Sequence, residues 1–170
     1  MEEGYIGKTS ISIYGRDNDL GETIQFTVPE GAEVSKPVKV DNYSREYKVT
    51  VKNGEQTKEY SIYYYRDVEQ FKLNNITDES NKITYRKSVY QGDDEGYVYI
   101  TGSNPELGES LQAEAAEGLS VEIVYAQKNE DGCYEFADGD TKAYPAKIVV
   151  KNGDATFCYY VYYEAESTAE

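Results

Sequence analysis

The sequence predicts an all-β protein made of two related modules, and three observations lead to this prediction. Apolar and polar residues alternate with a period of two through most of the 170 residues. Turn sequences such as Asn-Gly separate the alternating stretches. Finally, much of the first third of the chain returns later, which is typical of modules that are each a complete unit of packing.

The internal repeat has two aligned parts. Residues 13–34 match residues 100–121 at a shift of 87, with nine identities in 22 positions. Residues 51–64 match residues 150–163 at a shift of 99, with eight identities in 14 positions. The second copy therefore carries 12 additional residues (99 − 87) between its two aligned parts.

The repeat divides the chain into modules. We expect a first module over residues 1–66, a second over residues 67–165 and the start of a linker over residues 166–170, within a longer protein. The inserted segment falls near residues 126–140. The first module is short, so either its N-terminal strand is missing or the two copies share one sheet.

Alternating residues or flanking turns define each expected strand. In the first module the expected strands are 10–14, 23–28, 38–40, 47–51 and 59–65, with a tight turn at Asn53-Gly54. In the second they are 71–73, 82–85, 97–100, 110–113, 120–125, 134–136, 146–150 and 157–163. Seven or eight strands in a module of this length are typical of an immunoglobulin-like sandwich, usually about 100 residues.

One segment also fits a helix. Residues 111–117 contain several good helix formers, but their counterpart at 24–30 is β-branched and includes a proline. We therefore predict a strand in both copies.

The composition of the chain disfavours several classes of function. The formal charge of −15 disfavours nucleic acid and anionic membrane surfaces as partners. No apolar run is long enough to insert into a membrane. The chain has no His, the commonest general base, so neither cysteine has the partner that nucleophilic catalysis usually requires. These observations predict a protein that is not an enzyme.

The first closing hairpin carries a resemblance to a known family. The run YKVTVKNGEQTKEYSIY at 47–63, preceded by FTVPEG at 26–31, resembles the bacterial cadherin-like (immunoglobulin-like) β-sandwich repeats of surface and secreted proteins. The second copy keeps the hairpin at 147–153 and 159–163 but has Ala-Ala-Glu-Gly at 115–118 in place of the proline step. The resemblance implies a bacterial extracellular setting and spacer, adhesin-stalk or enzyme-appendage roles, without catalytic residues.

Tyrosine is the most conspicuous residue type, with 19 Tyr against 4 Phe and no Trp. The resemblance implies that Ile62 and Val161 are buried. Alternation along the closing strands then directs four rings to the outer faces: Tyr63, Tyr65, Tyr160 and Tyr162. Exposed rings stack on sugars, so these tyrosines are candidates for glycan binding, joined by Tyr134 of the insertion. The alternative is that the rings cover cross-strand neighbours or pack between modules.

Acidic residues and cysteines supply two further candidate sites. Calcium requires clustered oxygen ligands, and loops contain the carboxylates of Asp17, Asp19, Asp93, Asp94, Asp138 and Asp140. We expect these loops to be solvated turns with no metal or cofactor, and calcium binding is the alternative. Cys133 and Cys158 are candidates for a disulfide that would suit an oxidising compartment, and two free thiols are the alternative.

We therefore expect a non-catalytic extracellular module of a larger bacterial surface or secreted protein. It would act as a spacer or presenter for neighbouring domains of the same polypeptide, with adhesion to glycans or to a surface protein. The alternative function is a carbohydrate-binding module that uses exposed tyrosines. A third reading is a module that adds a partner's strand to an exposed sheet edge.

Overall fold

The computed structural model describes residues 9–21 and 24–167, and its elements are almost all β-strands. The all-β prediction is confirmed. The chain forms two compact units, Met1–Arg66 and Asp67–Glu170, and the division falls where the repeat places the module boundary.

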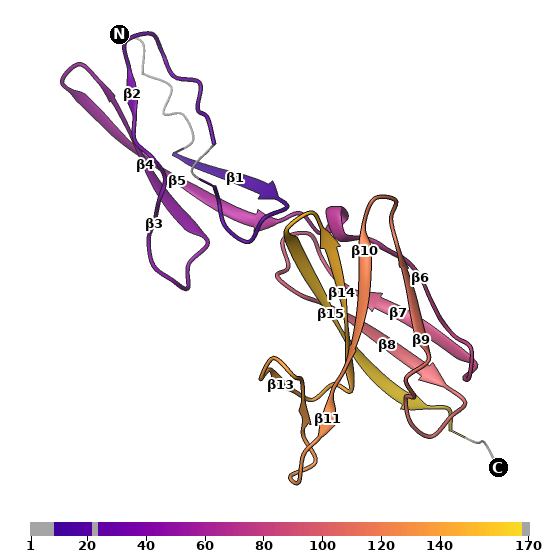
Figure 1. Ribbon diagram of the computed structural model, residues 1–170. Helices are drawn as coiled ribbons and strands as arrows, with labels where there is room; N and C mark the ends of the chain where they lie inside the picture. The colour runs from indigo at the N-terminus through magenta and orange to yellow at the C-terminus, as the bar shows by residue number, and fades with distance from the viewer. Residues whose placement is uncertain (1–8, 22–23, 168–170) are drawn as a thin grey trace. The chain divides into compact units, whose positions relative to one another are not determined.

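Unit 1 is built around one long hairpin (Figure 1). Its strands are β1 (Ser10–Gly15), β2 (Glu33–Val34), β3 (Val38–Lys39), β4 (Glu46–Asn53) and β5 (Gln56–Arg66). The sheet order is β1-β5-β4-β2, with β3 also paired to β4, and β1 runs parallel to β5. Gly54 has a φ of 63°, which is the left-handed conformation that the β4–β5 turn requires.

The core of unit 1 is small. Four side chains of β4 and β5 are buried: Tyr47, Val49, Ile62 and Tyr64. Residues 24–28 were expected to form a strand but do not pair, although Phe26 still packs against this core. In unit 2 the equivalent residues, 111–115, form a strand because they pair with residues 73–78. The described part of unit 1 contains no counterpart of residues 73–78, so residues 24–28 have no strand to pair with. Thr23 of that expected strand lies outside the described residues.

Unit 2 contains three sheets (Figure 1). It begins with a short 3₁₀ helix, η1 (Val68–Phe71), which replaces the first part of the strand expected at 71–73. The strands are β6 (Leu73–Asp78), β7 (Ile83–Ser88), β8 (Gly96–Gly102), β9 (Leu111–Ala115), β10 (Ser120–Tyr125), β11 (Gln127–Lys128), β12 (Tyr134–Glu135), β13 (Thr141–Lys142), β14 (Ala146–Asn152) and β15 (Ala155–Ala165).

The main sheet of unit 2 has the order β10-β14-β15-β8-β7. A second sheet, β6-β9, packs on one face and completes a core that contains Leu73, Ile76, Val98, Ile148 and Val161. The buried Tyr159 hydroxyl donates to the carbonyl oxygen of Phe71 at 2.9 Å, so its polar end is satisfied inside the core. The strand predicted at 110–113 is confirmed as β9, and no helix forms there.

The insertion forms the third sheet, β11-β12-β13. The sequence predicted one added edge strand at 134–136. Instead, β12 lies in the middle of a separate three-stranded sheet whose outer strands, β11 and β13, are only two residues long. Such short strands carry too little alternation to be recognised in a sequence. Figure 1 shows the insertion at one end of β10 and β14.

The two units share one pairing scheme. Ile13 on β1 lies opposite Tyr64 on β5, and the positions 87 and 99 residues further on, Ile100 and Tyr163, are also paired in parallel. Two other pairs repeat in the same way: Tyr47 with Ile62 and Ala146 with Val161, then Val34 with Val51 and Val121 with Val150. The sequence repeat therefore coincides with a repeat of strand register.

A hydrogen bond repeats as well. The Tyr64 hydroxyl donates to the backbone carbonyl of Asp17 at 2.9 Å, and the equivalent Tyr163 hydroxyl donates to the equivalent carbonyl of Asn104 at 2.5 Å. In each copy the tyrosine ring lies over a glycine of the paired strand, which is Gly102 in unit 2. The glycines at 15 and 102 are identical because a side chain there would collide with the ring.

Candidate functional site

Aromatic rings line the face of the main sheet of unit 2 that points away from the core. On β15, Tyr159 and Val161 are buried in the core, so Tyr160 and Tyr162 lie on the opposite face. The parallel register places β8 beside β15, with Tyr97 next to Tyr160. Their ring centroids are 6.4 Å apart, and those of Tyr99 and Tyr162 are 5.9 Å apart.

The insertion covers one half of this aromatic face. Phe136, which is 2% exposed, meets the ring of Tyr160 edge-on at 6.3 Å. Tyr144 lies 5.7 Å from Tyr160 and from Tyr97. Tyr160 is consequently 6% exposed, and the expectation that it faces solvent is wrong because the insertion folds over it.

Two polar contacts fasten the insertion to the sheet. The Tyr160 hydroxyl donates to Asp140 Oδ2 at 2.6 Å, and Lys147 Nζ contacts Asp138 Oδ2 at 2.6 Å. Burial, followed by the bond to Asp140, raises the pKa of Tyr160. The Lys147 hydrogen bond lowers the pKa of the Asp138 carboxyl. Gly139 between the two aspartates has a φ of 87°, so the turn that presents both carboxylates requires glycine.

The other half of the aromatic face is open. Tyr162 is 45% exposed, and the Arg86 guanidinium lies 4.5 Å from the ring centroid of Tyr99. A guanidinium over an aromatic ring is attracted to it electrostatically, so Arg86 helps to hold the Tyr99 ring in place. At the border with the covered half, the Tyr97 hydroxyl donates to Glu95 Oε1 at 2.8 Å, which raises the pKa of Tyr97 to about 12.

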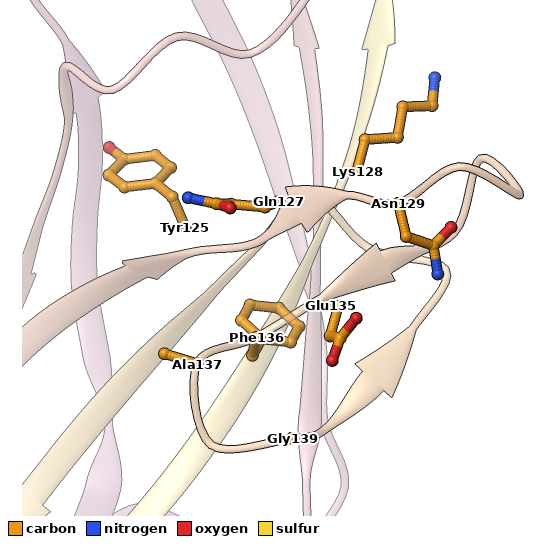
Figure 2. A pocket seen from close by; sticks show the side chains of 8 residues that line it. All are labelled: Tyr125, Gln127, Lys128, Asn129, Glu135, Phe136, Ala137 and Gly139. Atoms are coloured by element: carbon orange, nitrogen blue, oxygen red, sulfur yellow. The ribbon is translucent and has the colours of Figure 1, made fainter.

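Two hollows adjoin the small sheet of the insertion. Gln127 pairs with Glu135, and Lys128 pairs with Tyr134. Figure 2 shows the first hollow, of about 560 Å³, where Gln127 of β11 faces Phe136 across the opening and Glu135 lies beside it. Amide, carboxylate and ring groups converge on this hollow.

The second hollow, which we call the tyrosine hollow, has a volume of about 490 Å³. It brings together Tyr134 and Tyr162, two of the five tyrosines that the sequence proposed for glycan binding. The other lining residues are Pro105, Glu106, Leu107, Glu109, Tyr125, Ala126, Lys128, Ala143, Pro145 and Tyr163. Lys128 Nζ lies 5.8 Å from the centroid of the Tyr134 ring.

This composition gives the tyrosine hollow a defined chemistry. The rings of Tyr134 and Tyr162 offer flat apolar surface, whereas Glu106, Glu109 and Lys128 offer charged hydrogen-bonding groups near it. Apolar faces edged by polar groups match the two kinds of surface that a sugar ring presents. The hollow is thus suited to a small polyhydroxylated ligand.

Sequence reasoning missed several residues of this site. Tyr97 and Tyr99 alternate on their strand in the manner of Tyr160 and Tyr162, which was a usable signal. The position of Tyr97 and Tyr99 beside β15 could not be predicted from the sequence. A parallel pair between strands about 60 residues apart leaves no local sequence pattern. Glu106 and Glu109 come from a loop that the tertiary fold carries to the insertion.

Unit 1 holds its two candidate tyrosines in a different setting. Tyr65 stacks on Tyr14 with ring centroids 5.3 Å apart and an interplanar angle of 24°, and the Arg45 guanidinium lies 5.2 Å from the Tyr65 ring. Tyr63, opposite Glu46 on β4, is partly exposed. Within unit 1, the Tyr65 ring is therefore packed between Tyr14 and Arg45.

The acidic candidates for calcium serve mainly as partners of other protein groups. Asp19 Oδ1 contacts Lys39 Nζ at 2.8 Å, Asp17 pairs with Arg16, and Asp93 accepts a bond from the backbone of Tyr90. Among the described residues, no group of three or more His, Cys, Asp or Glu is placed to hold a metal ion. Asp94 also takes part in an interaction. The expectation that the chain binds no cofactor stays an untested prediction.

The two cysteines do not form the candidate disulfide. Cys133 is an exposed free thiol and Cys158 is a half-buried one, on the outer face of β15. Burial raises the pKa of the Cys158 thiol, which disfavours the reactive thiolate.

No family model matches the chain, and no curated protein matches it either. Within residues 9–21 and 24–167, no helix has the length and apolar character needed to cross a membrane.

Proposed function

We propose that the chain is a tandem of immunoglobulin-like modules related by duplication, and that it acts as a non-catalytic spacer or presenter in a larger bacterial surface or secreted protein. The observation that carries the proposal is the repeated strand register. The same three strand pairs recur at shifts of 87 and 99, down to the hydroxyl bonds of Tyr64 and Tyr163. Repetition of a complete packing unit is typical of proteins whose modules set distance and presentation.

The expected resistance of the fold to a pulling force also supports the spacer proposal. In unit 1 the first strand, β1, runs parallel to the last one, β5. A force that pulls the two ends of such a unit apart shears the hydrogen bonds of this pair together, whereas an antiparallel hairpin opens one bond at a time. This geometry favours a module that bears load.

Single-molecule stretching of the full chain tests this proposal. We expect two unfolding events, with the force on unit 1 carried by the parallel β1–β5 pair. Unfolding at negligible force would contradict a load-bearing spacer. Recovery of the full-length protein only from the cytosol, by fractionation and mass spectrometry, would contradict its surface placement.

The tyrosine hollow supports a second candidate function, which is carbohydrate binding. We expect a glycan array with the full chain to give binding that Tyr162→Ala and Tyr134→Ala weaken and that Tyr90→Ala, a similarly truncated tyrosine that is 74% exposed and outside the hollow, leaves unchanged. Silence of the wild-type chain on plant, host and microbial glycans would remove this candidate. It would leave the spacer proposal intact.

A further inference from the structure

Two strand edges of unit 2 face each other across the side of its sandwich. Within the described residues, β9 pairs with β6 alone, and β10 pairs with β14 alone. β9 and β10 follow one another along the chain (Figure 1), but they do not pair with each other. We call the space between them the β9–β10 seam. An unpaired strand edge exposes a row of backbone donors and acceptors and is a template for another strand.

The hydrogen bonds of β10 show which of its backbone groups face the seam. The amide of Ala126, directly after β10, donates to the carbonyl oxygen of Pro145 at 2.8 Å, on the side of β14. Because backbone groups alternate between the two edges of a strand, the even-numbered residues of β10 also face β14. Val121 and Ile123 therefore direct their N–H and C=O groups into the seam.

β9 presents the same kind of edge from the other side. The amide of Ala116 donates to the carbonyl oxygen of Lys72 at 3.0 Å, on the side of β6. The amide of Leu111 instead donates to the Tyr125 hydroxyl at 3.1 Å, so Leu111 and Ala113 face the seam with their backbone groups. The bond from Leu111 to Tyr125 bridges the seam at one end, and the turn between β9 and β10 bounds it at the other.

The seam is a groove with an apolar floor and a volume of about 510 Å³. It is lined by Asn75, Thr77, Glu109, Leu111, Gln112, Ala113, Glu114, Val121, Ile123 and Tyr125. Val121 and Ile123 pack against the core of unit 2 but are only partly buried. A strand that pairs with β10 at these residues would cover their remaining apolar surface, which favours binding.

The charge around the seam restricts the occupant. Residues 67–170 contain 21 Asp and Glu against eight Lys and Arg, whereas residues 1–66 contain 11 against nine. Residues 103–126, which include β9 and β10, contain five Glu and neither Lys nor Arg. The exposed residues Glu109 and Glu114 line the groove itself. A segment with basic side chains is therefore attracted to this edge.

The opposite edge of the main sheet has the reverse charge. β7 is the last strand at that edge, and residues 82–88 contain Lys82, Arg86 and Lys87 without Asp or Glu. A basic segment is repelled from β7 and attracted to β10. Charge therefore discriminates between the two outer edges of the sheet.

We propose that the β9–β10 seam is a peptide-binding site, in which an extended basic segment of a second protein adds a strand to the edge of β10. Alternate apolar side chains of the segment cover Val121 and Ile123, and its Lys or Arg side chains lie within reach of the glutamates that line the groove. The backbone pairing supplies affinity and the charges supply specificity. The seam shares Glu109 and Tyr125 with the tyrosine hollow, but the proposal does not rest on glycan binding.

The test uses the full chain and a short fluorescent peptide that alternates Lys and Val. We expect saturable binding and slower amide hydrogen exchange at Val121 and Ile123, whose N–H groups the added strand covers. A peptide that alternates Lys and Ser keeps the charge but leaves the apolar floor uncovered, so it should bind more weakly by about tenfold or more. Equal binding of the two peptides, no binding of the first, or unchanged exchange at Val121 and Ile123 would overturn the proposal.

A matched pair of chain variants locates the binding. Glu114→Lys reverses a charge that lines the groove, and Glu130→Lys makes the same change at an exposed position of the insertion. We expect the first variant to bind the Lys-Val peptide roughly 2- to 30-fold more weakly, because an ion pair is replaced by a like-charge contact. The second should bind it nearly as well as the wild type.

Two outcomes of this comparison contradict the proposal. Equal weakening in both variants would show that the peptide follows the net charge of the chain and not the seam. Self-association of the free chain that Glu114→Lys abolishes, without peptide binding, would make a second copy the occupant and overturn the proposal as stated.

Discussion

The Tyr163 hydroxyl donates a hydrogen bond to the carbonyl oxygen of Asn104 at 2.5 Å, across 59 residues of sequence. It also accepts a bond from Asn81 Nδ2 at 2.9 Å, and Asn81 Oδ1 accepts from the backbone of Asn104. Tyr163 therefore ties the last strand to the loop between β6 and β7 and to the loop after β8. Unit 1 repeats only the first bond, from Tyr64 to the carbonyl of Asp17.

Tyr163→Phe should destabilise unit 2. The substitution leaves the Asn104 carbonyl and the buried Asn81 side chain without a hydroxyl partner, which costs about 1–3 kcal/mol in the free energy of unfolding. Urea unfolding measures the change. Tyr162→Phe is the matched control, since that ring is 45% exposed, and an equal loss in both variants would contradict the role of Tyr163.

Gly102→Ala should also destabilise unit 2. A Cβ at this position would lie 2.5 Å from the Tyr163 hydroxyl oxygen and 2.7 Å from Asn81 Nδ2, so the ring must move and its bonds weaken. We expect a loss of about 1–3 kcal/mol by thermal or urea unfolding. Gly108→Ala is the control, because nothing lies within 4 Å of a Cβ there, and it should be nearly neutral.

Lys147→Met should loosen the insertion without unfolding the main sheet. The Lys147 side chain is 7% exposed, contacts Asp138 and lies 4.6 Å from the Phe136 ring centroid. Hydrogen–deuterium exchange should become faster in residues 127–142 and stay unchanged in β8 and β15. Lys151→Met, which removes an exposed lysine 3.7 Å from Glu122, is the control. Uniform acceleration would instead indicate global destabilisation.

The same contact should make the insertion sensitive to acid. Lys147 lowers the folded-state pKa of Asp138, so its contribution is present above the ordinary carboxyl pKa of about 3.9 and is lost as pH falls through the lower folded value. Tyrosine fluorescence of wild type and Asp138→Asn between pH 5 and pH 2 checks this, with these limits chosen to bracket about 3.9. The variant should lack the wild-type change in that interval, and identical curves would contradict the prediction.

Alkali should weaken unit 2 through Tyr159. Burial raises the pKa of Tyr159 to about 12, above the usual tyrosine value of about 10. The folded state then holds its proton more tightly than the unfolded state. The resulting stability is complete below pH of about 10 and is lost as pH rises toward about 12, a change of roughly 2–3 kcal/mol.

Comparison with Tyr159→Phe isolates this effect from the other tyrosines. The variant loses the bond to the Phe71 carbonyl, so it starts less stable at neutral pH. Its free energy of unfolding should nevertheless fall less steeply between pH 9 and pH 12, a range that brackets the ordinary pKa of about 10. Equal slopes in the variant and the wild type would exclude Tyr159 as the titrating group.

Alternation and turns in the sequence were sufficient to predict most strands. The hairpin of β4 and β5 is an example, because its strands alternate and Asn53-Gly54 has the conformational freedom for a tight turn. The same rule failed at residues 24–28, which alternate equally well but do not pair. Alternation predicts that one face of a segment can be buried. Strand formation also requires a neighbouring strand whose backbone groups complete the hydrogen bonds.

The sequence alone determined the all-β class, the two-part organisation and the face on which each tyrosine of β15 lies, because these properties depend on local periodicity and on self-similarity. Only the tertiary structure decided which of those tyrosines is accessible. Tyr160 and Tyr162 share a face, yet the insertion buries the first and leaves the second exposed beside Tyr134 in the tyrosine hollow. The folding of one segment over another depends on contacts between residues distant in sequence, and no local pattern encodes them.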